Sequence, residues 1–355
     1  MPLSIGIVGL PNVGKSTLFQ TITKRQVPRE NYPFCTIEPN VGVVEVPDKR
    51  VDILANLENS KRKIYVTVEF IDIAGLIAGA HKGEGLGNKF LAHIRECDAI
   101  LYLLRAFKDE NIVSTQNEIN PIKEKEILDT ELIFKDLETI QKRLNDLEKE
   151  AKSGKKEKII EYQFIKKINE LLSSGKILSE VIFSEEENKI LKNYQLLTQK
   201  PRLYILNGKI EEISQNIIQY FKNNNLPYLV LDIQQEFEFA NLSKEERREF
   251  GLEEKSELDL LIQKSYKLLD LITFFTTGKD ETRAWSIKNG STAPQAGGII
   301  HSDFEKYFVK AKIINFNDLI SAQNMQKAKE AGLIKIVGKD YIIQDGDIIE
   351  ILASA

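Results

Sequence analysis

The chain has 355 residues, of which 42% are hydrophobic and 29% charged, and its formal net charge is −4. This composition is typical of a globular protein with two or three domains. It excludes a surface that is basic throughout, so any RNA contact must come from local basic patches, and DNA binding is not expected. No stretch approaches the ~20 consecutive apolar residues that span a membrane, and the chain enters its first apolar run without a signal peptide. We therefore expect a cytoplasmic protein that binds no membrane.

A phosphate-binding loop follows the first predicted strand. Residues 9–16 read Gly-Leu-Pro-Asn-Val-Gly-Lys-Ser, and they come directly after the apolar run 3–8 and before a predicted helix. Backbone N–H groups of such a loop surround phosphate oxygens, while Lys15 adds positive charge and the Ser16 hydroxyl can bind Mg²⁺. The residues predicted to bind nucleotide here are Asn12, Val13, Gly14, Lys15, Ser16 and Thr17.

Two further elements lie at the distances that a switch-type NTPase requires. Asp72 ends the apolar strand 66–71, where it can hold a water on Mg²⁺, and the N–H of Gly75 can meet a γ-phosphate. Residues 31–40 contain two prolines and no hydrophobic period, which indicates a loop. The hydroxyl of Thr36 in this loop can bind Mg²⁺ or contact the γ-phosphate. The alternative is that Thr36 is an ordinary loop residue. The predicted metal site therefore comprises Ser16, Thr36 and, through water, Asp72.

Predicted strands and helices alternate along the first part of the chain. This order implies an α/β fold with a doubly wound, mostly parallel sheet. Strand-like sequence returns at residues 202–206 and 228–231, which completes the sheet around an inserted segment. The earlier predicted strands cover residues 5–8, 41–46, 66–71 and 99–104, with helices at 18–22 and 90–95.

The inserted segment, residues 118–198, has the pattern of two long helices. Apolar residues recur at alternating spacings of four and three, which forms a heptad seam on one helix face. A polar stretch at 152–158 interrupts this pattern before a second apolar stripe, so we predict an antiparallel coiled-coil hairpin with lysines at its tip. The tip is either a solvated loop or a contact with RNA or the ribosome. The seam residues are Ile133, Leu137, Ile140, Leu144 and Leu147, followed by Phe164, Ile168 and Leu171.

The C-terminal part has a different pattern from the rest of the chain. A helical period through residues 258–272 is followed, beyond residue 276, by short strands and turns, which predict a separate α+β unit. Its lysines at 306, 310 and 312 form either a solvated face or an RNA contact. The predicted domains are residues 1–275, interrupted by the helical insertion at 118–198, and residues 276–355.

Taken together, these motifs resemble the YchF or Obg-like ATPase family, in the Obg branch of the P-loop NTPases, over nearly the whole chain. The resemblance implies an OBG-type G domain with a helical coiled-coil insertion and a small C-terminal TGS domain of the β-grasp type, a module associated with RNA or ribosome binding. It also implies a Mg²⁺-dependent ATPase. The motifs that carry it are residues 9–17, 31–40, 72–77, 83–88, 283–285, 293–295 and 301–306.

The motif Asp-x-x-Gly at residues 72–75 is followed by a different residue from that in many small GTPases. Those enzymes place a glutamine there to orient the attacking water. This chain has Leu76, which has no donor or acceptor for that water, so we expect slow hydrolysis or help from another group. His81 either reaches the γ-phosphate or is a mobile surface histidine. A second location where family members can carry histidine has Ser114 here. No catalytic group is assigned from the sequence, and His81 and Asn12 are the candidates.

Asn12 is unusual for its place in the phosphate-binding loop. In related Obg-type loops an asparagine here helps to hold K⁺ between the phosphates, where the cation offsets developing negative charge. The alternative is a side-chain turn that stabilises the loop. The expected cofactors are therefore Mg²⁺ and, if Asn12 has the first role, K⁺.

Base recognition is expected where the strand 202–206 ends. A guanine site needs Asn-Lys-x-Asp, because the aspartate accepts two hydrogen bonds from guanine. This chain has Asn207-Gly-Lys-Ile210, and Ile210 cannot accept either bond. Obg-like ATPases carry Asn-x-x-Glu, and here an acid comes one position later, at Glu211. We therefore predict that Asn207, Gly208 and Glu211 contact the nucleotide and that ATP is favoured over GTP.

These features lead to one hypothesis and two alternatives. The hypothesis is a slow, Mg²⁺-dependent P-loop ATPase whose nucleotide state reshapes residues 31–40 and 75–87, changing how the helical and TGS-like modules meet a ribosome or ribosomal RNA. The first alternative is a GTPase of the same architecture. The second is a non-catalytic protein that binds the ribosome or RNA under the control of nucleotide.

Overall fold

The computed structural model describes residues 3–25, 40–73, 93–108, 119–240, 242, 244–249 and 256–354. The chain divides into two compact units. The first contains residues 1–26, 36–42 and 69–258, and the second contains residues 27–35, 43–68 and 259–355.

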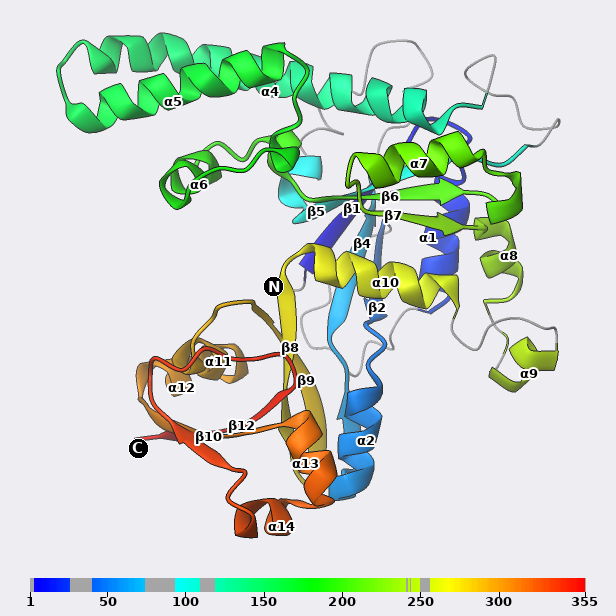
Figure 1. The fold of residues 1–355 in the computed structure, drawn as a ribbon, viewed down its shortest axis with the longest axis vertical. Helices are drawn as coiled ribbons and strands as arrows, with labels where there is room; N and C mark the ends of the chain where they lie inside the picture. The colour runs from blue at the N-terminus through cyan, green and yellow to red at the C-terminus, as the bar shows by residue number, and fades with distance from the viewer. Residues whose placement is uncertain are drawn as a thin grey trace. The chain divides into compact units, whose positions relative to one another are not determined.

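The first of two six-stranded sheets has the strand order β2-β4-β1-β5-β6-β7 (Figure 1). Neighbouring strands from β1 to β7 pair in parallel. The strands β5 and β6 are buried along their whole length, as expected when helices cover both faces of a parallel sheet. The strands are β1 (Leu3–Val8), β2 (Val41–Glu45), β4 (Thr67–Asp72), β5 (Ala99–Arg105), β6 (Arg202–Asn207) and β7 (Tyr228–Leu231).

Short helices follow the strands of this sheet. The turn after β7 is closed by Asp232, whose side chain accepts a hydrogen bond of 3.0 Å from the N–H of Gln235 and so caps the next helix. Tyr102, Tyr204 and Phe221 form an aromatic cluster in the core beside the sheet. The helices are α1 (Lys15–Thr23), α7 (Gln215–Asn223), α8 (Ile233–Glu238), α9 (Lys244–Glu249) and α10 (Glu257–Leu268), with a 3₁₀ turn η6 (Ile210–Glu212).

The inserted segment is an antiparallel helical hairpin, which confirms the prediction from its heptad pattern (Figure 1). The seam residues Ile133, Ile140 and Leu147 are buried against Phe164 and Ile168 of the returning helix. A polar turn separates the helices where the sequence predicted the tip. The elements are α4 (Pro121–Ala151), α5 (Lys156–Ser173), η4 (Leu178–Glu180), α6 (Glu185–Lys192) and η5 (Leu197–Gln199).

The second sheet has the order β11-β10-β12-β8-β9-β3 and is mixed, with β8 and β9 forming an antiparallel hairpin. Phe274, Ile313 and Ile349 lie in its core with Ala293 and Ala296 from a covering helix. The strands are β3 (Arg62–Ile64), β8 (Leu271–Thr277), β9 (Glu281–Lys288), β10 (Phe308–Asn315), β11 (Lys335–Val337) and β12 (Asp347–Ala353). The helices are α2 (Lys49–Glu58), α11 (Ala293–Ile300), α12 (Ser302–Lys306), α13 (Phe316–Ala322) and α14 (Met325–Glu330).

The structure confirms the α/β fold class but places some element limits differently from the sequence. The predicted helix through residue 272 ends at Leu268, because Asp270 turns the chain with a φ of 53° into β8. The predicted domain boundary between residues 275 and 276 therefore falls inside β8. Of the short strands predicted beyond residue 276, the one at residues 340–343 is only a single bridge, at Ile342. Among the described residues, no helix is long and apolar enough to cross a membrane.

Candidate nucleotide-binding site

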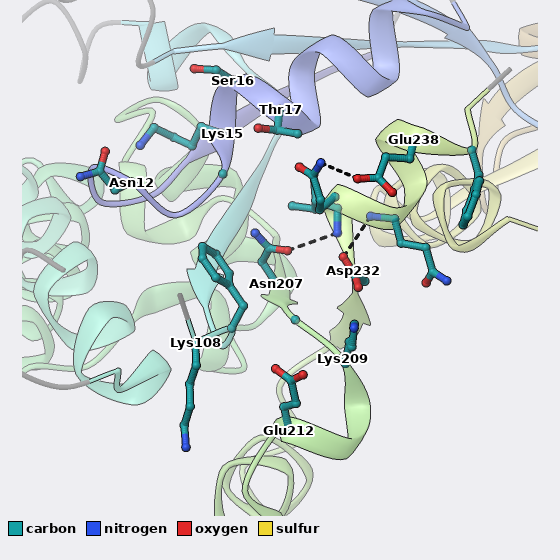
Figure 2. Close-up of a pocket in the computed structure, with 17 residues that line it drawn as sticks. Asn12, Lys15, Ser16, Thr17, Lys108, Asn207, Lys209, Glu212, Asp232 and Glu238 are labelled. Carbon is teal, nitrogen blue, oxygen red and sulfur yellow. Dashed lines mark hydrogen bonds between the residues drawn. The ribbon is translucent and has the colours of Figure 1, made fainter. Parts of the chain in front are cut away.

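A pocket of about 850 Å³ opens at the carboxyl ends of β5, β6 and β7 and beside the loop that leads into α1. Ligands of α/β folds bind at this edge of the sheet, and the volume suits a nucleotide. Figure 2 shows Asn12, Lys15, Ser16 and Thr17 on one side of the pocket and Lys209 and Glu212 on another.

The phosphate-binding loop has the backbone conformation that its sequence predicts. Gly14 has a φ of 99° immediately before α1, and Asn12 has a φ of 64°. A side chain at Gly14 would meet the Asn207 amide nitrogen at 2.6 Å, so glycine is required both for the turn and for the close approach. The N-terminus of α1, with its free N–H groups, therefore opens onto the pocket and favours an anion there.

Lys15 is folded back onto its own loop. Its Nζ donates hydrogen bonds to the backbone oxygens of Gly9 and Leu10 at 2.8 and 2.6 Å. Burial lowers the pKa of Lys15 to about 8, while the negative charges of Asp72 and Glu124 oppose this effect. In this structure the ammonium is therefore held by two backbone oxygens of its own loop, which phosphate oxygens would have to replace.

The candidate Mg²⁺ ligands offer oxygen donors. Ser16 lines the pocket, and Asp72 is a buried carboxylate at the end of β4 whose charge acts on Lys15. In the described part of the chain no group of three or more histidine, cysteine, aspartate or glutamate side chains could hold a metal by itself. The oxygens of Ser16 and Asp72 suit Mg²⁺, which takes one or two protein oxygens and completes its shell with phosphates and water.

Asn207 joins the two sides of the pocket. Its Nδ2 donates to the backbone oxygen of Val13 at 2.9 Å, and its Oδ1 accepts from the N–H of Ile233 at 3.2 Å. Both halves of the amide are thus engaged, and the side chain is buried. Asn207 therefore fixes the phosphate-binding loop relative to α8, and Val13 contributes its carbonyl to this link instead of lining the pocket.

Of the two acids that follow Asn207 closely, Glu212 lines the pocket, whereas Glu211, which was chosen from the sequence, does not. The residues after Asn207 form the 3₁₀ turn η6, in which successive side chains point about 120° apart. Glu212 and Lys209 consequently lie in the pocket wall, whereas Glu211 and Ile210 do not, and Ile210 is 51% exposed.

Several other lining residues were missed from the sequence because no motif marks them. Phe107 and Lys108 follow β5, and Gln235, Glu238 and Phe239 belong to α8 or its end. Their position just after parallel strands was the available signal, because these strand ends meet at one edge of the sheet. The remaining predicted site residues lie outside the described residues, namely Thr36, Gly75 and His81, together with Leu76 and Ser114.

The whole chain is similar to known proteins. It is 46% identical over 361 residues to the ribosome-binding ATPase YchF of Bacillus subtilis, with 98% of each chain covered. It is 43% identical to the protein of the same name from Escherichia coli O157:H7, with 99% of each chain covered. The chain belongs to the YchF family.

Family models and a solved structure agree with this assignment. A model described as 50S ribosome-binding GTPase matches residues 4–162, and the YchF C-terminal model, described as a protein of unknown function (DUF933), matches residues 271–354. The solved structure of the Schizosaccharomyces pombe YchF GTPase superposes with a TM-score of 0.89 at 35% identity, covering 99% of this chain and 97% of that one. That YchF protein thus shares the fold of this chain over nearly its whole length.

Proposed function

We propose that this YchF protein is a slow, Mg²⁺-dependent ATPase that associates with the ribosome. The observation that carries the proposal is the pocket formed by the phosphate-binding loop, with Lys15 and Ser16 on one wall and the β6 and β7 strand ends on the other. The relatives named ribosome-binding ATPase, which match over nearly their full length, support it. Association with the ribosome would place the protein in the cytoplasm.

The chain's own residues would bind the phosphates directly and would also hold the Mg²⁺ that accompanies them. Lys15 would leave the oxygens of Gly9 and Leu10 for the β- and γ-phosphates, and the N–H groups at the start of α1 would complete the anion site. Ser16, Thr36 and, through water, Asp72 would hold Mg²⁺, which when bound would neutralise charge on the β- and γ-phosphates. Gly75 would meet the γ-phosphate with its N–H.

Slow turnover follows from Leu76, because its side chain cannot orient the attacking water. We expect a rate far below the ~10 s⁻¹ that is the median for enzymes.

If Asn12 holds K⁺, replacing K⁺ by Na⁺ slows the reaction further, and Asn12→Ala removes the difference between the two salts. Phosphate release by the purified protein in each salt is the measurement. Fast unassisted hydrolysis would refute the first expectation, and equal rates in the two salts would leave Asn12 with a structural role in the loop.

Association with the ribosome is tested by co-sedimentation. We expect the fraction of protein that pellets with ribosomes to differ between Mg–ATP and Mg–ADP, because a switch protein changes its loops with the γ-phosphate. The hairpin tip is one candidate contact. Its Lys152 and Lys158 already pair with Glu148 and Glu161, at 3.0 and 2.8 Å. The same pelleted fraction with both nucleotides, or none with either, would contradict the proposed switch.

A GTPase of the same architecture is the second candidate. Two observations favour it: the structural neighbour from Schizosaccharomyces pombe is called a GTPase, and Glu212 brings a carboxylate into the pocket wall. A carboxylate can accept from the 6-amino group of adenine, but also from the N1–H and 2-amino groups of guanine. We favour ATP because Ile210 occupies the position of the guanine-reading aspartate.

A further inference from the structure

Arg105, the last residue of β5, is a buried cation that the proposed function does not use. Only 3% of its surface is exposed. Its guanidinium carbon lies 4.6 Å from the centre of the Phe107 ring, and its Nε donates a hydrogen bond of 3.4 Å to the backbone oxygen of Phe107. A planar guanidinium is attracted to the face of an aromatic ring, most strongly where water is excluded. Arg105 therefore holds both the ring and the backbone of Phe107.

Phe107 belongs to the wall of the nucleotide pocket. A side chain at Gly208 would come within 3.0 Å of the backbone nitrogen of Phe107. The backbone of Phe107 thus lies against the residues after Asn207, where base recognition is expected. Aromatic side chains bind nucleotide bases by stacking, and this contact accepts any base because every base has a π-face. The Phe107 ring is therefore placed to meet a base.

The backbone before Phe107 is fixed by two neighbouring elements. The carboxylate of Glu124, in the first turn of α4, accepts a hydrogen bond of 2.8 Å from the N–H of Arg105. The N–H of Ala106 donates to the backbone oxygen of Asn207 at 2.9 Å, and Arg105 lies opposite Asn207 in the pairing of β5 with β6. β5 ends at Arg105, so the Phe107 ring lies beyond the strand. The contacts with the Arg105 side chain therefore orient this ring relative to a fixed strand end.

A second buried arginine makes a similar contact with a ring in the core. Arg202 begins β6, and its guanidinium carbon lies 5.6 Å from the centre of the Tyr102 ring. Its Nη2 donates to the backbone oxygen of Leu197 at 3.3 Å. Tyr102 is fully buried and does not line the pocket. Arg105 differs from Arg202 because the ring that it holds lines a ligand site.

We propose that Arg105 is a positioning residue that presents the Phe107 ring to the nucleotide base. The guanidinium covers one face of the ring, which leaves the opposite face for stacking. Arg105 thereby acts on the nucleotide only through Phe107. Because stacking does not distinguish between bases, this contact strengthens the binding of ATP and GTP alike and leaves the choice between them to the residues after Asn207. The inference rests on the nucleotide site proposed above.

Arg105→Met tests the proposal, because methionine has a similar length but neither a charge nor an N–H donor. Binding of Mg–ATP, Mg–GTP and Mg–tripolyphosphate is measured by calorimetry, since tripolyphosphate carries the phosphates without a base. We expect the variant to bind Mg–ATP and Mg–GTP each about five- to tenfold more weakly, and to bind Mg–tripolyphosphate as the wild type does. A defect in the fold or in the phosphate-binding loop would instead weaken the binding of all three.

Phe107→Leu separates positioning from any other effect of Arg105. It removes the ring and should weaken Mg–ATP binding at least as much as Arg105→Met does. Adding Arg105→Met to Phe107→Leu should cause no further loss, because the arginine then has no ring to hold. Arg105→Lys keeps the charge but lacks the planar fork, and it should retain part of the affinity. A further loss in the double variant as large as that in Arg105→Met alone would contradict the proposal.

Arg202→Met is the matched control and should bind all three ligands as the wild type does. Thermal unfolding shows which variants are folded. If Arg105→Met is not, Arg105→Lys and Phe107→Leu give the same comparison between ATP and tripolyphosphate. Unchanged Mg–ATP binding in Arg105→Met, or equal losses for ATP and tripolyphosphate, would overturn the proposal. Failure of the wild type to bind either Mg–ATP or Mg–tripolyphosphate would instead refute the nucleotide site.

Discussion

Lys15→Ala is expected to weaken nucleotide binding by more than about 100-fold, because the loop then has no charged donor for the β- and γ-phosphates. The ammonium now rests on two backbone oxygens of its own loop, from which it can reach incoming phosphates. The measurement is the dissociation constant for Mg–ATP by calorimetry or a fluorescent analogue. Thermal unfolding of the variant shows whether the fold survives the loss of these two hydrogen bonds.

Lys24→Ala provides the control on the same helix. Lys24 lies at the end of α1, where its ammonium contacts the Phe237 ring and donates to the Phe237 backbone oxygen at 2.9 Å. It does not line the pocket, so its variant should bind Mg–ATP as the wild type does. Wild-type affinity in Lys15→Ala, or an equal loss in both variants, would show that the loop does not bind phosphates as described.

Local sequence patterns predicted the phosphate-binding loop and the helical hairpin, because the structure of each depends on residues close together in the chain. The phosphate-binding loop needs a left-handed residue before the helix, and glycine at position 14 supplies it. The hairpin needs one apolar stripe on each helix, and Ile140 and Ile168 are fully buried within it. Both features are encoded within a few turns of chain, so sequence spacing is sufficient to find them.

The sequence did not show which residues come together from distant parts of the chain. Glu212 enters the pocket wall because η6 turns Glu211 away, and a shift of one residue in a 3₁₀ turn leaves no trace in composition. Asn207, predicted as a nucleotide contact, lines the pocket, and its amide also connects the backbone of Val13 and Ile233, which the sequence did not show.

Domain limits were uncertain for the same reason. The second sheet includes β3, which lies far earlier in the chain and pairs in parallel with β9, with Arg62 opposite Glu281. Ser60 supports this pairing by donating to the backbone oxygen of Gly278 at 2.7 Å. A short, charged edge strand of this kind carries little hydrophobic pattern, so its assignment to a sheet formed mainly by residues after 270 required the structure.

The preference for ATP is the second large effect that we expect. Ile210 is exposed on η6 and offers no acceptor, so guanine loses a charge-assisted pair that is worth roughly 1.5–3 kcal/mol, or about ten- to hundredfold in affinity. Ile210→Asp supplies that acceptor and should shift the preference towards GTP if η6 turns position 210 towards the base when nucleotide binds, because in the present geometry this position lies outside the pocket wall. The variant is compared with the wild type by competition between the two nucleotides.

The neighbouring acids Glu211 and Glu212 give a matched pair of variants for the same question. Glu212→Gln should change the ratio of ATP to GTP affinity, because Glu212 lines the pocket, whereas Glu211→Gln should leave it unchanged. The reverse result would return Glu211 to the role that the sequence predicted for it and would require η6 to rearrange when nucleotide binds.

Competition between ATP and GTP for the wild-type protein, in Mg²⁺ and K⁺ at pH 7, tests the central claim most directly. A sequence with Ile210 in the place of the guanine-reading aspartate predicts that GTP needs about ten times the concentration of ATP, or more, to displace half of a bound ATP analogue. Displacement by GTP at a lower concentration than ATP would contradict the ATPase assignment and establish the GTPase alternative.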